Sequence, residues 1–329
     1  MIKVGIIGTN WITQRMIDAA NATGEYQLTA VYSRTEKRAI EFAQQNNCEQ
    51  TFTQLDEFFA SPAFDTVYIA SPNSFHYRQV LTAIQNDKNV IIEKPAFLSP
   101  YQVQSVFDEL KNHPDVHLFE AARNIHMPAF KELKKRLAET ERIDGADLTF
   151  SQYSSRYDLV LQNQTPNVFN LDFGGGTLAD LGIYPLYAAI GLFGKPRKQA
   201  YYPTFIKSGA DGKGTAVLTY DKFTVTLNFS KMSNSNQNSE VYSARKVFEI
   251  DSAGEFTTAW ETDQTKQVIS DTYQSNPMIP ELQDFARVLN HPEDVTNQND
   301  YQNWLELVKT VNLILVRLAN TAGIEYPQN

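Results

Sequence analysis

The sequence predicts an α/β protein with an N-terminal, doubly wound parallel sheet of the Rossmann type. A C-terminal α+β domain with a large, mostly antiparallel sheet is expected to follow it. Three observations predict this fold. Short apolar strands alternate with helical segments over residues 1–121, as in βαβ units. Beyond residue 122, strand-like segments alternate apolar and polar residues, which is typical of a sheet with one buried face. The 329 residues fit two domains, since one core rarely grows past about 250 residues.

The N-terminal elements follow in order. Strands are expected where apolar runs are continuous, and helices where apolar residues recur at helical spacing. The expected strands are Ile2–Ile7, Leu28–Tyr32, Thr66–Ala70, Val90–Ile92 and Val116–Phe119. The expected helices are Trp11–Thr23, Glu36–Gln45, Ser74–Asn86 and one that begins at Pro100 with Ser99 as its N-cap. Gly24 is expected to end the first helix.

The C-terminal elements differ in pattern. Helices are expected at Pro128–Thr140 and Trp304–Leu318, the second strongly apolar. The expected strands are Ala146–Tyr153, Thr215–Tyr220, Phe223–Phe229, Lys246–Ile250 and Phe256–Trp260. Ser208–Gly214 and Ser233–Ser239 are rich in turn residues and are expected to be loops. The predicted domains are therefore residues 1–121 and 122–329.

Composition excludes several classes of protein. Lys and Arg number 29 and Asp and Glu 38, which gives a net charge of −9 and disfavours nucleic-acid binding. Cys48 is the single cysteine, so a disulfide framework and a Cys-rich metal site are excluded, and no metal centre is expected. The N-terminus does not resemble a signal peptide, and no apolar stretch is expected to span a bilayer. We therefore expect a cytoplasmic protein with neither a nucleic-acid nor a membrane partner.

The turn after the first expected strand has part of a dinucleotide-binding pattern. In such a turn the first glycine permits the bend, the second admits the pyrophosphate, and the third lets helix and strand pack closely. Gly8 holds the first place, but Asn10 and Thr13 stand at the other two. Because Asn tolerates positive φ better than most residues, we expect the turn to be retained. The alternative is an ordinary βα turn without a ligand.

The end of the second expected strand indicates which cofactor is preferred. A site selective for NAD normally has an acidic residue here, which binds the ribose hydroxyls. This chain has none, and instead offers cations and hydroxyl groups that suit a 2′-phosphate. These residues are Ser33, Arg34, Thr35 and Arg38. The hypothesis is a preference for NADP(H); the alternative is that the two arginines are solvated surface cations.

Polar residues follow two more expected strands, at the edge where open α/β sheets bind ligands. Ser71-Pro72-Asn73, with His76, follows one strand, and Glu93-Lys94-Pro95 ends the other. The charged pair Glu93 and Lys94 is either a salt bridge at a strand end or part of a reaction centre.

A glycine-rich segment in the C-terminal half is the last unusual feature. Gly174, Gly175 and Gly176 precede Asp180 and Tyr184. If the segment is helical, the four-residue spacing puts the Asp180 and Tyr184 side chains on one face. The alternative is a glycine hinge followed by a core helix in which Tyr184 only packs.

Taken together, these segments resemble the Gfo/Idh/MocA oxidoreductase family. The resemblance implies an N-terminal dinucleotide-binding domain and a C-terminal domain that binds substrate and forms homodimers or homotetramers through its sheet. It also implies hydride transfer between a nicotinamide cofactor, NADP or NAD, and a carbon bearing oxygen in a sugar, polyol or related molecule. Tyr184 stands where the commoner pattern has His, as in the glucose–fructose oxidoreductase and dimeric dihydrodiol dehydrogenase branches.

The resemblance assigns roles to individual residues. Lys94, Tyr184 and Asp180 would be catalytic. The cofactor-binding residues would be Gly8, Thr9, Asn10, Trp11, Ile12, Ser33, Arg34, Thr35, Arg38, Ser71, Pro72, Asn73, His76, Glu93 and Lys94. The substrate-binding residues would be Arg123, Asn124, Tyr153 and Asn167. Ile125 stands where many members have Arg, so either Arg123 substitutes for it or the substrate needs no cation there.

The expected mechanism couples hydride transfer to proton transfer. Tyr184 would exchange the proton, Lys94 would be the cation that makes its phenol more acidic, and Asp180 would orient one of them. Two other functions remain open. One is a nucleotide-binding sensor without catalysis, which the altered glycines favour. The other is a nicotinamide-dependent lyase or isomerase with no net redox change.

Overall fold

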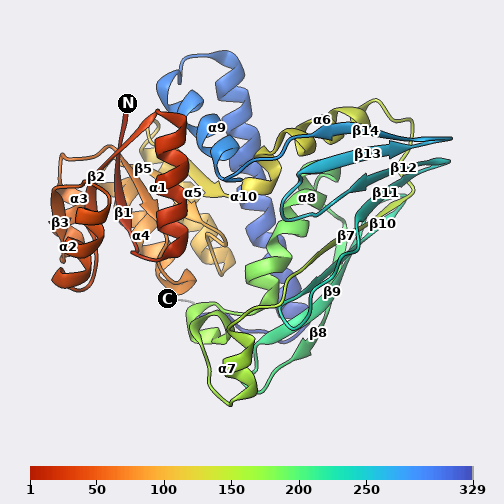
Figure 1. Ribbon diagram of the computed structural model, residues 1–329, viewed down its shortest axis with the longest axis horizontal. Coiled ribbons are helices and arrows are strands. Elements are labelled where there is room, and N and C mark those ends of the chain that lie inside the picture. Colours follow the sequence, from red (N-terminus) through yellow and green to blue (C-terminus); the bar gives the residue numbers. More distant parts are fainter. Residues whose placement is uncertain (328–329) are drawn as a thin grey trace. The chain divides into compact units, whose positions relative to one another are not determined.

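The computed structural model describes residues 1–327 and divides the chain into two compact units (Figure 1). The first unit contains Met1–Ala121 and Met278–Val308, and the second contains Ala122–Pro277 and the segment that starts at Lys309. The sequence prediction assigned all of residues 122–329 to the second domain. Residues 278–308 instead pack with the N-terminal unit, because their apolar side chains complete its core.

The first unit contains a six-stranded sheet in the order β3-β2-β1-β4-β5-β6. Every neighbouring pair is parallel, which confirms the predicted doubly wound sheet. The strands are β1 (Ile2–Ile7), β2 (Tyr26–Tyr32), β3 (Gln50–Phe52), β4 (Thr66–Ile69), β5 (Asn89–Glu93) and β6 (Leu118–Ala121). The helices between these strands are α1 (Trp11–Thr23), α2 (Glu36–Gln45), α3 (Leu55–Ala60), α4 (Asn73–Gln85) and α5 (Pro100–Asn112).

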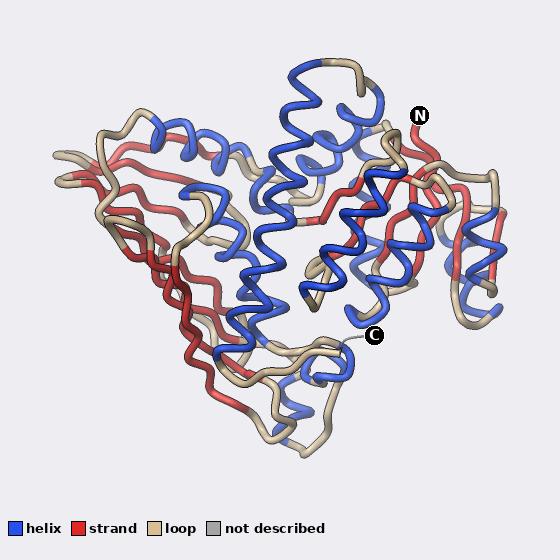
Figure 2. The backbone as a smooth tube through the Cα atoms, turned by 180° about the vertical axis from the view of Figure 1, so that it is seen from behind, coloured by secondary structure: helices blue, strands red, loops and turns tan. Residues whose placement is uncertain are grey.

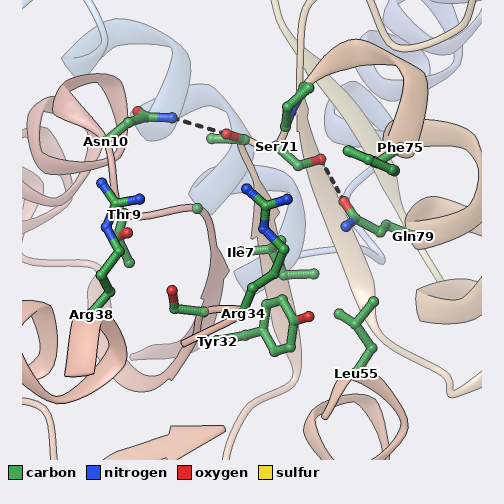
Figure 3. Close-up of a pocket in the computed structure, with 14 residues that line it drawn as sticks. Ile7, Thr9, Asn10, Tyr32, Arg34, Arg38, Leu55, Ser71, Phe75 and Gln79 are labelled. Atoms are coloured by element: carbon green, nitrogen blue, oxygen red, sulfur yellow. Dashed lines mark hydrogen bonds between the residues drawn. The ribbon is translucent and has the colours of Figure 1, made fainter. Parts of the chain in front are cut away.

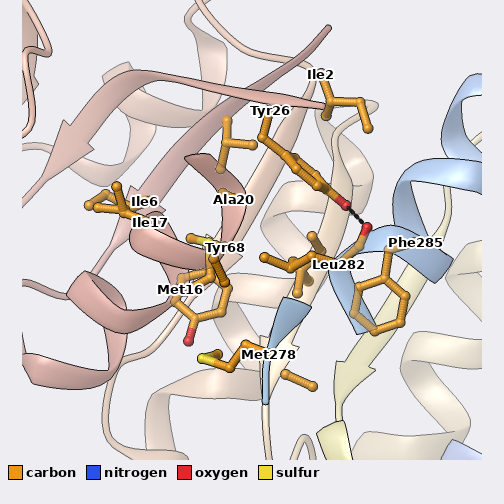
Figure 4. Packing of buried hydrophobic residues seen from close by; sticks show 14 of the residues in the cluster. Ile2, Ile6, Met16, Ile17, Ala20, Tyr26, Tyr68, Met278, Leu282 and Phe285 are labelled. Atoms are coloured by element: carbon orange, nitrogen blue, oxygen red, sulfur yellow. Dashed lines mark hydrogen bonds between the residues drawn. The ribbon is translucent and has the colours of Figure 1, made fainter. Parts of the chain in front are cut away.

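Helix α9 (Ile279–Asn290), which the sequence analysis did not predict, packs against α1 in this unit. Its apolar side chains Leu282 and Phe285 join Met16 and Tyr26 in one buried cluster (Figure 4). The Tyr26 hydroxyl donates a 2.7 Å hydrogen bond to the Leu282 carbonyl oxygen, so its polar atom is satisfied inside the core. Burial raises the pKa of Tyr26 well above its usual value. A segment distant in sequence thus completes the core around α1.

The second unit is built on an eight-stranded sheet in the order β14-β13-β12-β11-β7-β10-β9-β8. Only β10 and β7 pair in parallel, so the sheet is mostly antiparallel, as predicted. The strands are β7 (Gly145–Ser151), β8 (Lys198–Phe205), β9 (Asp211–Thr219), β10 (Thr224–Ser230), β11 (Ser239–Ser243), β12 (Lys246–Ile250), β13 (Thr258–Thr262) and β14 (Lys266–Asp271). The α-helices of this unit are α6 (Pro128–Ala138), α7 (Tyr157–Leu161), α8 (Ile183–Phe193) and the C-terminal part of α10 (Val295–Thr321).

One face of this sheet is buried and the other is open. In β10, Val225, Leu227 and Phe229 are buried, while Thr226 and Asn228 between them are only partly covered. Helix α8 contacts β7 and β10, and helices lie along one face of the sheet (Figure 2). The alternating pattern in the sequence therefore arises from a sheet covered by helices on one side.

Part of the segment Ser208–Gly214, which was predicted to be a loop, is a strand, since β9 begins at Asp211. Its glycines reflect close packing as well as turn formation. A Cβ atom at Gly214 would lie 2.4 Å from the Tyr201 ring, so β8 and β9 can pair in this way only with glycine there. The strands β8, β11 and β14 were also not predicted.

One helical stretch, Leu171–Phe193, is as long and apolar as a membrane span, and 72% of its most apolar window is buried inside the structure. The sequence analysis did not single out this stretch. Core helices pass the same test, so length and composition do not make this stretch a membrane segment. Its apolar character follows from burial within the second unit.

Candidate active site

The turn between β1 and α1 requires glycine at its first position for two reasons. Gly8 has φ of +106°, a value that side chains rarely allow. A Cβ atom at Gly8 would also lie 2.7 Å from the Ala70 carbonyl oxygen at the end of β4. The tight turn predicted from Gly8 is present.

Asn10 acts differently from the expectation. Its φ is −108°, so positive φ is not the reason that Asn is accepted here. Asn10 is the N-cap of α1, and its Oδ1 accepts hydrogen bonds from the backbone N–H groups of Ile12 (3.0 Å) and Thr13 (3.2 Å). Its Nδ2 donates to the Ala70 carbonyl oxygen at 3.0 Å. The side chain thus holds the start of α1 against the end of β4.

A cavity of about 290 Å³ lies at the carboxyl ends of β1, β2 and β4 (Figure 3). Eight predicted cofactor residues line it: Gly8, Thr9, Asn10, Ser33, Arg34, Arg38, Ser71 and Pro72. The structure also describes the other predicted cofactor residues, but they are not among those that line the cavity: Trp11, Ile12, Thr35, Asn73, His76, Glu93 and Lys94. The lining residues that sequence reasoning missed are Ile7, Tyr32, Leu55, Ala70, Phe75 and Gln79. Several of these lie at or next to strand ends, a position that could have identified them.

The cavity is electropositive. The Arg34 and Arg38 guanidinium groups both point toward it, and no acidic side chain is among its lining residues (Figure 3). Burial raises the pKa of the neighbouring Tyr32, and the positive charge of Arg34 opposes that shift. Ser71 donates a 2.7 Å hydrogen bond to Gln79, which orients the polar wall opposite the arginines. Such a donor set fits an anion such as a phosphate group.

His76 does not line this cavity but contacts the backbone of Ser71, which does. Its ring is fully buried, with Nδ1 2.9 Å from the Pro95 carbonyl oxygen and Nε2 2.8 Å from that of Ser71. Burial lowers the pKa of His76 to about 4, although both carbonyl contacts act in the opposite direction. The ring connects the turn after β4 with Pro95, which follows Lys94 through a cis peptide bond. We therefore describe His76 as a residue that positions these two turns.

The charged residues Glu93 and Lys94 stand at the end of β5. Glu93 is 9% exposed and accepts a 2.7 Å hydrogen bond from the buried Tyr68 hydroxyl. Lys94 is half-buried in the first unit. Glu93 is therefore held by the neighbouring strand, and Lys94 follows it directly at the end of β5.

In the second unit, Tyr184 lies near the start of α8 and is 4% exposed. Its hydroxyl oxygen accepts a 2.6 Å hydrogen bond from Arg123 Nη1, and the guanidinium carbon lies 4.8 Å from the ring centroid. Arg123 Nη2 donates to Glu255 at 2.8 Å. The cation beside the phenol within this unit is thus Arg123, which the sequence analysis had assigned to the substrate.

Asp180 has a partner that the sequence did not indicate. It lies in a π-helical turn, η4 (Leu178–Gly182), and its Oδ2 is 2.6 Å from Lys231 Nζ. The expected sharing of one helix face by Asp180 and Tyr184 assumed α-helical spacing, which the wider π-helical turn does not have. No motif marks Lys231, which stands at the end of β10 among serines and asparagine.

The predicted substrate residues divide into two groups. Asn124 is buried, and its Nδ2 donates to the backbone oxygens of Tyr184 and Ala253, so it supports the start of α8. Tyr153 is 36% exposed and donates to Asp158, and Asn167 is exposed at the start of the 3-10 turn η2 (Asn167–Phe169). The second group is available to a ligand.

A polar hollow of about 200 Å³ borders the Tyr184 network. Its lining residues are Thr149, Phe150, Ser151, Gln152, Ser235, Gln237, Asp251, Ser252 and Glu255. Glu255 holds Arg123, and the Phe150 ring packs edge-on against Tyr184 at 5.4 Å. The lining contains hydroxyl, amide and carboxyl groups and no basic side chain.

The doubly wound sheet, the glycine turn and the cationic cavity define a dinucleotide-binding protein. The model of the Gfo/Idh/MocA family, described as an oxidoreductase family with an NAD-binding Rossmann fold, matches residues 2–122. The scyllo-inositol 2-dehydrogenase (NADP(+)) IolU of Bacillus subtilis (strain 168) is 34% identical over 335 residues, which cover 99% of each chain. The chain belongs to the Gfo/Idh/MocA oxidoreductase family.

Two further proteins are similar to this chain. The uncharacterized oxidoreductase YgjR of Escherichia coli (strain K12) is 39% identical over 241 residues, 73% of each chain. The structure of KijD10, a 3-ketoreductase from Actinomadura kijaniata in complex with NADP and TDP-benzene, superimposes with a TM-score of 0.81 over 99% of each chain at 20% identity. That likeness supports the fold of both units.

Proposed function

We propose that this protein is an NADP(H)-dependent oxidoreductase that transfers a hydride to or from a hydroxyl-bearing or carbonyl carbon of an uncharged sugar or polyol. The observation that carries the cofactor preference is the cavity beside β2, where Arg34 and Arg38 meet Ser33 without an acidic residue. Gly8 supports cofactor binding because only glycine lets the turn approach Ala70 so closely. IolU, 34% identical, is itself named as an NADP(+) dehydrogenase.

The residues of this chain would supply proton transfer and charge stabilisation. A nicotinamide cofactor, when bound, gives or accepts the hydride. Tyr184 exchanges the proton with the substrate oxygen, and the Arg123 guanidinium stabilises negative charge on the phenol oxygen that it contacts. Lys94 stabilises the charge that develops on the substrate oxygen. Glu255 holds Arg123 in place and offsets its charge.

The proposed substrate is uncharged because Arg123, beside Tyr184, and Lys231, beside Asp180, already have anionic partners. Arg123 is paired with Glu255, and Lys231 with Asp180. The hollow beside them offers hydroxyl, amide and carboxyl groups, which bind the hydroxyl groups of a polyol. An anionic substrate would meet Asp251 and Glu255 there.

The test is the change in NADPH absorbance with a panel of inositols, pentoses and hexoses, their keto forms, and matched aldonic acids and sugar phosphates. We expect kcat/KM to be at least about tenfold higher for an uncharged compound than for its anionic counterpart, since like charges repel in a partly buried site. A higher kcat/KM for the anionic compounds would contradict the substrate class. Cofactor binding without turnover would support a sensor, and turnover without net NADPH consumption would support a lyase or isomerase.

Replacing Arg34 tests the cofactor preference. Arg34→Ala should raise the Kd for NADPH by about 10- to 100-fold, the usual size of a lost charge-assisted contact with phosphate. The Kd for NADH should change much less, because NADH has no 2′-phosphate. Fluorescence titration measures both constants. Arg78→Ala, an exposed arginine of α4 that does not line the cavity, is the matched control. An equal loss of affinity for both cofactors would argue against this role.

We also propose that the protein is a cytoplasmic homodimer or homotetramer that associates through the open face of the eight-stranded sheet, without nucleic-acid or membrane partners. The partly covered alternate residues of β10 and the net charge of −9 support this proposal. A monomeric mass of 37.3 kDa in light scattering would contradict association, and recovery in the membrane fraction would contradict the compartment.

A further inference from the structure

Lys231 is a buried ammonium group in the second unit. Its side chain is 2% exposed, whereas that of Asp180, its partner at 2.6 Å, is 35% exposed. A lysine side chain is rarely buried so completely unless other groups compensate its positive charge. Lys231 thus lies beneath Asp180, on the protein side of the proposed catalytic carboxylate.

The ammonium group has two further contacts, both in the turn η2. Lys231 Nζ donates to the Val168 carbonyl oxygen at 3.1 Å and lies 4.4 Å from the centroid of the Phe169 ring. The side chain therefore connects Asp180 with the turn that contains Asn167, one of the exposed residues predicted to bind substrate. A carboxylate, a carbonyl and a ring face together satisfy the charged group.

The backbone of Lys231 is held as firmly as its side chain. Its N–H donates to the Gly212 carbonyl oxygen in β9, and its carbonyl oxygen accepts from the Ser154 N–H group, both at 2.9 Å. These bonds fix the backbone from which the side chain extends, and the ammonium group is held by its own contacts with Asp180, Val168 and Phe169. A rigidly held partner is what a catalytic carboxylate needs in order to keep one orientation.

We propose that Lys231 is a positioning residue that keeps the Asp180 carboxylate oriented and aligns the Asn167–Phe169 turn with it. This inference rests on the proposed oxidoreductase function, in which Asp180 is expected to orient Lys94 or Tyr184. Lys231 itself is covered by Asp180 and η2, so its effect reaches the reaction through Asp180. The sequence analysis expected Asp180 to orient Lys94 or Tyr184. The proposal adds that Asp180 is itself oriented by Lys231, a residue of the same unit.

The test is a double-mutant cycle with Lys231→Met, Asp180→Asn and the double variant, in the presence of NADPH and the best neutral substrate. If Lys231 acts through Asp180, Lys231→Met should lower kcat by about tenfold or more in the wild-type background and by less than about twofold in the Asp180→Asn background. The KM for NADPH should remain unchanged, because the contacts described for Lys231 lie in the second unit. Equal factors in both backgrounds would overturn the inference.

The control variant is Lys266→Met. Lys266 also lies 2.6 Å from a carboxylate, Glu249, and 4.5 Å from an aromatic centroid, that of Trp260, but it is 45% exposed on β14. Lys266→Met should leave kcat unchanged.

Thermal unfolding of the four proteins of the cycle shows whether each is folded. If Lys231→Met is not folded, Lys231→Gln replaces it. Wild-type protein without turnover on any compound would overturn the proposed function and this inference with it, whereas an active wild type with additive losses overturns only the inference.

Discussion

Tyr184→Phe is expected to lower kcat by about a hundredfold or more, the scale on which an acid–base group contributes. The substitution removes one oxygen atom and keeps the ring that packs against Phe150. Arg123 keeps its bond to Glu255, so the surrounding charges remain compensated. NADPH affinity should persist, because the cationic cavity lies in the first unit. Single-turnover measurement of NADPH oxidation separates the chemical step from binding.

The matched control is Tyr187→Phe in the same helix. Tyr187 is 1% exposed, so this variant also removes a buried hydroxyl from α8. It should change kcat by less than about threefold, since Tyr187 has no assigned place in proton transfer. Similar losses in the two variants would show that packing of α8, and not the Tyr184 hydroxyl, limits the rate.

Lys94→Met should also lower kcat by about a hundredfold, because it removes the cation proposed to stabilise the developing alkoxide. Methionine keeps most of the apolar stem of this half-buried side chain. The Kd for NADPH should change by only a few fold, which equilibrium fluorescence can measure.

Lys111→Met, at a 73% exposed lysine of α5, provides the control and should leave both constants unchanged. If Lys94→Met weakened NADPH binding by the same factor as it lowered kcat/KM, Lys94 would be a binding residue and its catalytic assignment would fail.

Local signals in the sequence identified the first unit well. Helices α1 and α2 begin and end at the predicted residues, because a cap, a C-terminal glycine or an apolar face marks them. Helix α9 was missed because its apolar face has meaning only against α1, more than 250 residues earlier in the chain. Glycines at close contacts concealed the start of β9, where they resemble loop residues.

The candidate site shows the same limit. Strand-end position and the missing acidic residue were enough to predict the lining residues Ser33, Arg34 and Arg38. The partners of the reactive groups could not be predicted in this way. Arg123 and Tyr184 are 61 residues apart, and Lys231 meets Asp180 only because β10 ends beside a π-helical turn. Such pairs depend on the three-dimensional path of the backbone, which no local pattern records.

The discontinuous build of the first unit limits how this enzyme can be re-engineered. A gene fragment that ends at Ala121 would encode all six strands of the parallel sheet but would leave the α1 side of its core, including Met16 and Tyr26, without α9. Exposed apolar surface of this kind promotes aggregation. A chimera designed to change cofactor specificity therefore has to take residues 278–308 and the N-terminal segment from the same parent protein.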